Sequence, residues 1–250
     1  MKIHRAIAVI AVLGLPLPTT AAHAADIKLL GGNALNAVIE ELGPQFEKTT
    51  ENKLLITLGT SAQLKARIES GEAFDAVLLT KAALDELATA GKVADVPRIA
   101  IARAGIGVAI RKGAVKPDLS TTDAFKQAML NAKSIGFVDQ TPTAAALKAI
   151  FVKLGIADEI KSKLKPLTIQ AAVAVTNGDV EIAMTQISEI LPYPGVELAG
   201  PLPPDIQTYT VFSGGVSATA KNAEGAAALI KFLTSPDAKA VIKAKGMEPG

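Results

Sequence analysis

The pattern that decides the fold occurs three times, and its first copy is IKLLGGNALNAVIEELGPQF at residues 27–46. The second copy is LLITLGTSAQLKARIE at residues 54–69, and the third is SIGFVDQTPTAAALKAIFVKL at residues 134–154. In each copy a short apolar run predicts a strand, a small polar cluster predicts a tight loop, and the periodic segment after it predicts a helix. Strands that alternate with helices predict an α/β protein with parallel sheets.

The polar loops of the three copies carry the first functional signal. Each loop leaves the unpaired backbone N–H groups of a helix start beside a hydroxyl or amide side chain. The side chains in question are Asn33, Thr60, Ser61 and Thr143. Such a junction holds a small anion without a cationic side chain. If the three helix starts converge in the fold, the sequence predicts a receptor for a small anion.

The first 24 residues have the pattern of an export signal. Lys2 and Arg5 precede an apolar stretch at residues 6–17 that is too short to span a bilayer, and Ala22-His23-Ala24 is a small-x-small cleavage site. We expect cleavage after Ala24 and a periplasmic location. No cysteine follows to accept a lipid, and no later segment is long and apolar enough to insert into a membrane.

Loss of that leader changes the chemistry that the chain can perform. The formal net charge falls from +2 to zero because Lys2 and Arg5 leave, and both histidines, His4 and His23, leave with them. A chain without His or Cys has no Ser-His-Asp relay, no thiol nucleophile and no zinc or copper ligands of the usual kind. We therefore expect no enzyme activity, no cofactor and no metal site, although a carboxylate-only Mg²⁺ or Ca²⁺ site stays open.

The same charge balance bears on the partners. A mature chain of zero net charge without a basic patch is not expected to bind nucleic acid or an anionic membrane surface. The 250 residues, 49% of them hydrophobic, suffice for one large domain or two smaller ones. The strand-rich runs near residues 103 and 212 predict two crossings, with residues 25–103 and 213–250 in a first lobe and 104–212 in a second.

Several short motifs, taken in order, add a resemblance to a known family. They are GGN at 31–33, GTSAQL at 59–64, GEAFDAV at 71–77, DQTPT at 139–143 and NGD at 177–179. With them the mature chain resembles the periplasmic molybdate-binding proteins of ATP-driven (ABC) importers. The resemblance implies the type II periplasmic binding protein fold, which has two α/β lobes, two hinge crossings and a ligand in the cleft between the lobes.

The resemblance also implies which residues hold the ligand. Position by position, it points to five places on this chain: Asn33, Ser61 with Thr60 beside it, Thr143, Thr168 at the start of a helix predicted over 169–176, and Gln186. Two of these depart from the family, which has Ser at position 33 and Tyr at position 186. An amide carbonyl repels a fully deprotonated oxyanion and suits a ligand that carries its own hydrogen-bond donor.

Charged residues near the junctions have ordinary interpretations. Asp139 is expected to be a loop carboxylate that bonds nearby N–H groups or solvent, since a second negative charge in a dry anion site would repel the ligand. Lys65 and Arg67 are expected on the solvated side of their helix. The sequence leaves open whether Asp139 or Lys81 reaches the cleft.

These inferences predict a monomeric periplasmic solute-binding protein that captures a molybdate-like oxyanion and delivers it to a membrane permease. A small organic carboxylate or another hydroxylated anion is the alternative ligand, motivated by Asn33 and Gln186. An exported hydrolase is the remote alternative, because a Ser or Thr nucleophile needs no histidine. The binding loops, however, contain no Gly-x-Ser-x-Gly elbow and no Ser-x-x-Lys motif.

Overall fold

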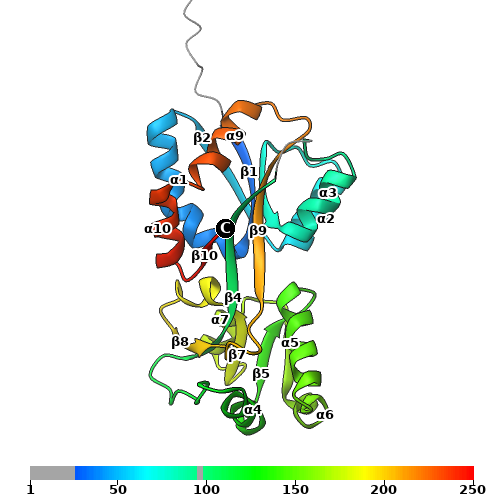
Figure 1. The fold of residues 1–250 in the computed structure, drawn as a ribbon, viewed down its shortest axis with the longest axis vertical. Coiled ribbons are helices and arrows are strands. Elements are labelled where there is room, and N and C mark those ends of the chain that lie inside the picture. The colour runs from blue at the N-terminus through cyan, green and yellow to red at the C-terminus, as the bar shows by residue number, and fades with distance from the viewer. Residues whose placement is uncertain (1–25, 95–97) are drawn as a thin grey trace, which may run out of the picture.

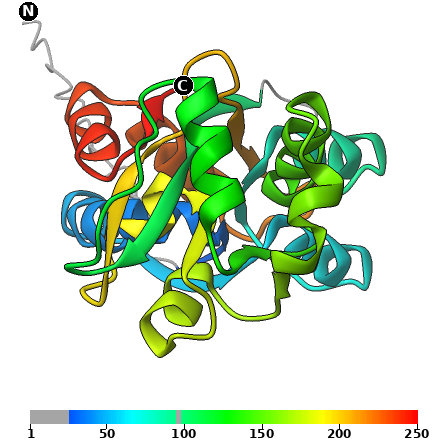
Figure 2. The same cartoon turned by 90° about the horizontal axis from the view of Figure 1, so that it is seen from below.

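The computed structural model describes residues 26–94 and 98–250 and has two α/β lobes stacked along its long axis (Figure 1). Viewed along that axis, the helices of the second lobe lie in front of the first lobe (Figure 2). The predicted signal peptide, residues 1–24, lies outside the described residues. Within the described ranges, no helix is long and apolar enough to cross a membrane.

The first lobe is built from both ends of the described chain. Its elements are β1 (Asp26–Gly32), η1 (Asn33–Leu35), α1 (Asn36–Thr50), β2 (Lys53–Gly59), α2 (Ser61–Glu69), β3 (Ala76–Thr80), α3 (Lys81–Thr89), α9 (Ala223–Phe232), α10 (Pro236–Ala244) and β10 (Glu248–Pro249). Helices α1 and α10 cover one face of its sheet, and α2 and α3 cover the other (Figure 1).

The second lobe is built from the middle of the chain. Its elements are α4 (Thr122–Asn131), β5 (Ile135–Val138), α5 (Pro142–Lys153), α6 (Ala157–Ile160), η2 (Lys161–Lys163), β6 (Leu164–Leu167), α7 (Ala171–Asn177), β7 (Ile182–Gln186), α8 (Ile187–Ile190) and β8 (Val196–Pro201). Two strands, β4 (Ile99–Arg111) and β9 (Tyr209–Val216), run between the lobes (Figure 1).

The strand order is β2-β1-β3-β9-β4-β7-β5-β6, with β8 and β10 pairing to β4. The predicted parallel pairing is confirmed for β1 with β2 and β3, and for β5 with β6 and β7. It is wrong for β4 and β9, which lie antiparallel to their neighbours. These two strands connect the lobes directly, so no crossover helix turns the chain between them.

Alternation along the strands places apolar side chains on both faces of each sheet. In β1, Ile27 and Leu29 pack in the cluster under α1 and α10, whereas Leu30 packs in the cluster under α2 and α3. In β4, Val108 belongs to the cluster with α4 and α5, and Ala109 to the cluster with α7 and β8. Strands that are buried on both faces read as continuous apolar runs, which explains the pattern of the sequence.

The strand β4 changes partners halfway along its length. Up to Gly105 it pairs with β9, and from Ile106 it pairs with β7. At this exchange the side-chain amide of Gln207 accepts from the Ile106 N–H and donates to the Ile106 carbonyl, at 2.9 Å each. The carbonyl also accepts from the Leu202 N–H at 3.1 Å, so the Ile106 N–H is the group that depends on Gln207. The partition into lobes at residues 103 and 212 stays a prediction, and β9 starts at Tyr209.

Two local predictions in the second lobe are wrong. The lysine-rich stretch at residues 161–165 predicts a basic surface turn, but the structure has a 3-10 turn there followed by β6, which forms because Leu164 pairs with Ile135 of β5. The helix predicted over 169–176 begins only at Ala171, so Thr168 lies in the loop before α7 rather than at its start. The β6 correction reflects tertiary pairing that a local pattern does not contain.

Replacement of Gln207 by Ala tests the contact at the exchange point. Gln207→Ala removes the acceptor of the buried Ile106 N–H, and we expect a loss of about 1–3 kcal/mol in the free energy of unfolding. Urea denaturation measures it. The control is Gln45→Ala, which changes an exposed amide in the middle of α1 and should be close to neutral. Equal stability of the two variants would contradict this role of Gln207.

Candidate functional site

A cleft of about 890 Å³ lies between the two lobes. The first lobe lines it with the loop after β1 and with the starts of α2 and α3. The second lobe lines it with the β5–α5 loop, the β6–α7 loop and the end of β7. The strand ends and helix starts of both lobes therefore point at one space, as in other open α/β sheets whose ligands bind beyond the carboxyl ends of the strands.

All of the predicted ligand residues line this cleft. They are Asn33, Thr60, Ser61, Thr143, Thr168 and Gln186. Asn33, Thr60 and Ser61 belong to the first lobe, and the other three belong to the second. The three sequence junctions thus converge in the fold. Binding of a ligand by these residues remains a prediction.

The start of α2 is a capping box. The Thr60 hydroxyl accepts from the Gln63 N–H at 3.2 Å, and the Gln63 side chain accepts from the Thr60 N–H at 3.0 Å. The Ser61 hydroxyl accepts from the backbone N–H of Thr80 at 3.1 Å. In these contacts both hydroxyls act only as acceptors, so their own protons are free to be donated into the cleft.

Two threonines at the start of α5 have different roles, one as the helix cap and the other at the cleft wall. Thr141 is the N-cap, and its hydroxyl accepts from the Ala144 N–H at 3.1 Å and donates to the Val138 carbonyl at 2.9 Å. Thr143 is buried at the wall of the cleft, and its hydroxyl has no hydrogen-bond partner among the described residues. The cap therefore leaves Thr143 available to a ligand.

Four of the six predicted side chains share this lack of a partner. Within residues 26–94 and 98–250, the side chains of Asn33, Thr143, Thr168 and Gln186 make no hydrogen bond to the protein. Gln186 is only 6% exposed, and its side-chain oxygen is fully buried without a partner. Thr143 and Gln186 are buried, whereas Asn33 is half-buried and Thr168 is exposed. Buried polar groups are nearly always paired, so the unpaired side chains of Thr143 and Gln186 at the cleft wall indicate a binding surface.

Three ion pairs, two of them made by Lys65, flank the cleft. Lys65 contacts Glu86 at 2.8 Å and Glu69 at 3.2 Å, and these hydrogen bonds raise the pKa of Lys65. Lys65 is partly exposed on the solvated side of α2, as predicted, and it also lines the cleft one helical turn after Ser61. Asp139 also lines the cleft, and its contact with Lys148 at 3.1 Å holds its pKa below the usual range.

Glu189, which sequence reasoning missed, has a different environment. Its carboxyl lines the cleft and accepts hydrogen bonds from the Thr185 hydroxyl and the Gln186 backbone, and burial raises its pKa. No Lys or Arg of the described residues forms an ion pair with it. The spacing from Gln186 to Glu189 is that of a helix cap and its N3 acid, a signal that could have located it.

The loop between β5 and α5 contains a further residue that was missed. Gln140 lines the cleft with a φ of 57°, a left-handed conformation that is unfavourable for a residue with a long side chain. Strained backbone of this kind concentrates at functional loops. The residue stands inside the DQTPT motif, but nothing in the sequence reveals its φ.

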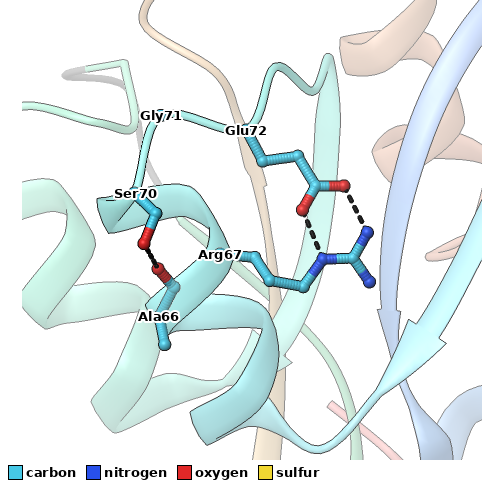
Figure 3. A pocket seen from close by; sticks show the side chains of 5 residues that line it. All are labelled: Ala66, Arg67, Ser70, Gly71 and Glu72. Atoms are coloured by element: carbon cyan, nitrogen blue, oxygen red, sulfur yellow. Dashed lines mark hydrogen bonds and ion pairs between the residues drawn. The ribbon is translucent and has the colours of Figure 1, made fainter.

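The remaining charged candidates lie elsewhere. Lys81 is not part of the cleft wall and pairs with Asp85 on the surface of α3. Arg67 lies, as predicted, on the exposed side of α2, where it forms a bidentate ion pair with Glu72 beside a shallow open hollow (Figure 3). Because that pair already satisfies both charges, the hollow offers no free ionic group to a ligand.

The described residues contain no group of three or more His, Cys, Asp or Glu side chains that could hold a metal ion. What the cleft offers is a ring of hydroxyl and amide groups from two lobes, the N-termini of α2 and α5, and one lysine. Helix N-termini and hydroxyl donors suit a small anion, and the carboxyl groups of Glu86, Asp139 and Glu189 line the same cleft.

A model of the bacterial extracellular solute-binding protein family matches residues 27–248. The chain belongs to this family. The solute-binding protein is 30% identical over 229 residues to aconitate isomerase of a Pseudomonas species, a match that covers 89% of this chain and 87% of that protein. It is 27% identical over 248 residues to the molybdate-binding protein ModA of Azotobacter vinelandii, with 94% of each chain covered.

Solved structures support the fold. The solute-binding protein superposes on the periplasmic molybdate-binding protein of Azotobacter vinelandii with a TM-score of 0.77 at 19% identity, covering 90% of this chain and 99% of that one. The predicted two-lobed α/β fold and the resemblance to the periplasmic molybdate-binding proteins are thereby confirmed. The ligand of this chain does not follow from the match.

The environment of Glu189 predicts how stability depends on pH. Because its pKa is raised in the folded state, the folded protein keeps a proton that the unfolded chain releases above about pH 4.3. Stability therefore falls as the pH rises from that value through the folded-state pKa. In urea denaturation at a series of pH values, we expect the free energy of unfolding of Glu189→Gln not to decrease over this pH range. The exposed control variant Glu159→Gln should show the same decrease as the wild type. Identical pH profiles for all three proteins would contradict the assignment.

Proposed function

We propose that this protein captures a small organic anion with several carboxylates in the interlobe cleft and presents it to the permease of an ABC importer. The observation that carries the proposal is the set of unpaired polar side chains that converge on the cleft from both lobes. A ligand that bonds to all of them draws the lobes together about β4 and β9. The closed monomer is the form that docks on the permease in the periplasm.

The chemistry of the walls favours an organic anion over a bare oxyanion. A tetrahedral oxyanion without protons accepts hydrogen bonds only, yet the buried oxygen of Gln186 needs a donor. Three carboxyl groups, of Glu86, Asp139 and Glu189, also line the cleft. The volume of about 890 Å³ falls in the range of sites for organic ligands. The relative named aconitate isomerase supports a tricarboxylate as the first probe.

Isothermal titration separates the two ligand classes. We expect saturable heat with trans-aconitate or citrate, and weaker or no heat with molybdate, tungstate and sulfate. Thermal-shift screening should place the same compounds in the same order of affinity as the titration does. The reason is that only ligands that bind the folded state raise the midpoint of thermal unfolding. Tight binding of molybdate without any response to tricarboxylates would contradict the proposed ligand class and restore the oxyanion prediction.

Removal of one ligand hydroxyl tests the cleft itself. Thr143→Ala should weaken binding of the tricarboxylate roughly 10-fold to 100-fold, because a hydrogen bond to a charged group contributes about 1.5–3 kcal/mol. The stability should change little, since that hydroxyl bonds nothing in the free protein. The control is Thr89→Ala, on the exposed face of α3. Unchanged affinity of Thr143→Ala would place the ligand elsewhere.

A second candidate function is isomerisation of the bound acid. Two observations favour it: the relative named aconitate isomerase, and Glu189, a carboxyl without a cation that can take a proton from a carbon and return it. Incubation of trans-aconitate with the protein in D₂O tests it. Deuterium in the recovered acid, lost with Glu189→Gln while binding persists, would support an enzyme, and its absence would leave a binding protein.

A further inference from the structure

Among the carboxyl groups of the cleft, Glu189 alone lacks a cation. Glu86 contacts Lys65 at 2.8 Å, and Asp139 contacts Lys148 at 3.1 Å. The Glu189 carboxyl accepts hydrogen bonds only from the Thr185 hydroxyl and from the backbone N–H of Gln186. The cleft therefore presents an entering anion with two carboxylates that are neutralised by lysines, Glu86 and Asp139, and with one carboxyl, Glu189, that has no counter-ion.

The groups packed around α8 do not supply the missing charge. The neighbouring η1, α7 and β7 carry no titratable side chain, and β4 brings Arg103 and Arg111, which bond to Glu248 and to the Val175 carbonyl. On β8, Glu197 pairs with Lys116. In the loop that follows α10, Lys245 pairs with Glu41.

Tyr193 follows α8 and does not titrate near neutral pH. Its pKa is raised by burial first, and further by the negative charges of Glu189 and Glu40. The pKa of Lys65 across the cleft is raised as well. Burial raises the pKa of the Glu189 carboxyl above its ordinary range, so Glu189 is the carboxyl at this wall whose protonation is favoured with no cation to oppose it.

Gln186 adds an acceptor beside that carboxyl. It stands three residues before Glu189, and its buried side-chain oxygen has no donor. The wall at the end of β7 therefore presents acceptors, whereas Thr60, Ser61 and Lys65 on the opposite lobe present donors. A fully deprotonated anion satisfies the donor wall and is repelled by the acceptor wall.

We propose that the cleft binds its anion together with one proton, which Glu189 shares with a carboxylate of the ligand while Gln186 accepts from a second donor of the ligand. The inference rests on the proposed function and specifies it. When two carboxyl groups approach each other in a site shielded from water, one of them holds a proton. Acids that hold a proton easily are thereby selected over anions such as sulfate, which hold none near neutral pH.

The test is titration of the full mature chain with trans-aconitate from about pH 6 to pH 9. Where free Glu189 is ionised, binding takes up about one proton, so the affinity falls about tenfold for each unit of pH. The titration is repeated in buffers with different heats of ionisation, such as MOPS, imidazole and Tris. The slope of the binding heat against the buffer's ionisation heat gives the number of protons taken up. Glu189→Gln should bind without proton uptake and with an affinity that is nearly independent of pH.

Two further variants make the result specific. Glu86→Gln removes a cleft carboxyl that has a cation, and it should keep the wild-type dependence on pH. Thr185→Val removes a donor to the Glu189 carboxylate, and it should move the fall in affinity to higher pH. Thermal unfolding of each variant verifies that it is folded.

The failures are distinguishable. Binding of trans-aconitate by wild type without proton uptake at any pH, or a Glu189→Gln protein that keeps the wild-type pH dependence, would overturn the shared proton and leave the cleft as a binding site. No binding of trans-aconitate or citrate across the whole range would overturn both the inference and the proposed ligand class.

Discussion

The structure depends on one strand that belongs to two sheets. β4 pairs with β9 up to Gly105 and with β7 from Ile106, so both lobes are fixed to a single stretch of backbone. At the exchange its buried peptide group would lose a partner, and the Gln207 side chain supplies one. Buried backbone groups are nearly always satisfied, and the Gln207 side chain meets this requirement where β4 changes partners.

The same exchange locates the cleft. Ile106 lies opposite Gln186 in the register of β4 and β7, so Gln186, whose side-chain oxygen is unpaired, lies opposite the point at which β4 changes partners. Glu189 follows one helical turn later. Both residues therefore lie close to the strand that joins the lobes. A ligand that satisfies them links the chemistry of the site to the position of the lobes.

Much of this could be predicted from the sequence because the signals are local. A strand, a polar cluster and a helix start follow one another within about 20 residues in each of the three junctions. The cap at Thr60 forms as expected, the third junction is capped by Thr141, and the first has no side-chain cap. What the sequence could not supply depends on tertiary contact. β6 exists because it pairs with β5, and Lys65 reaches the cleft because α2 presents that side to it.

Glu189 illustrates the limit most clearly. Its spacing from Gln186 indicates a helix cap. Its proposed role in binding, however, depends on the absence of a nearby cation, which is a property of the folded protein and not of the local sequence. Conversely, the amides at positions 33 and 186 could be recognised in the sequence as poor partners for a bare oxyanion. The structure adds that the oxygen of Gln186 is buried and unpaired.

The measurement that tests the central claim most directly is a crystal structure grown with equal concentrations of trans-aconitate and molybdate. Our account predicts density for the tricarboxylate between Ser61, Thr143 and Gln186, with a carboxylate next to Glu189. Molybdenum scatters anomalously and would be recognised without ambiguity. An anomalous peak in the cleft, with no density for the organic acid, would contradict the account.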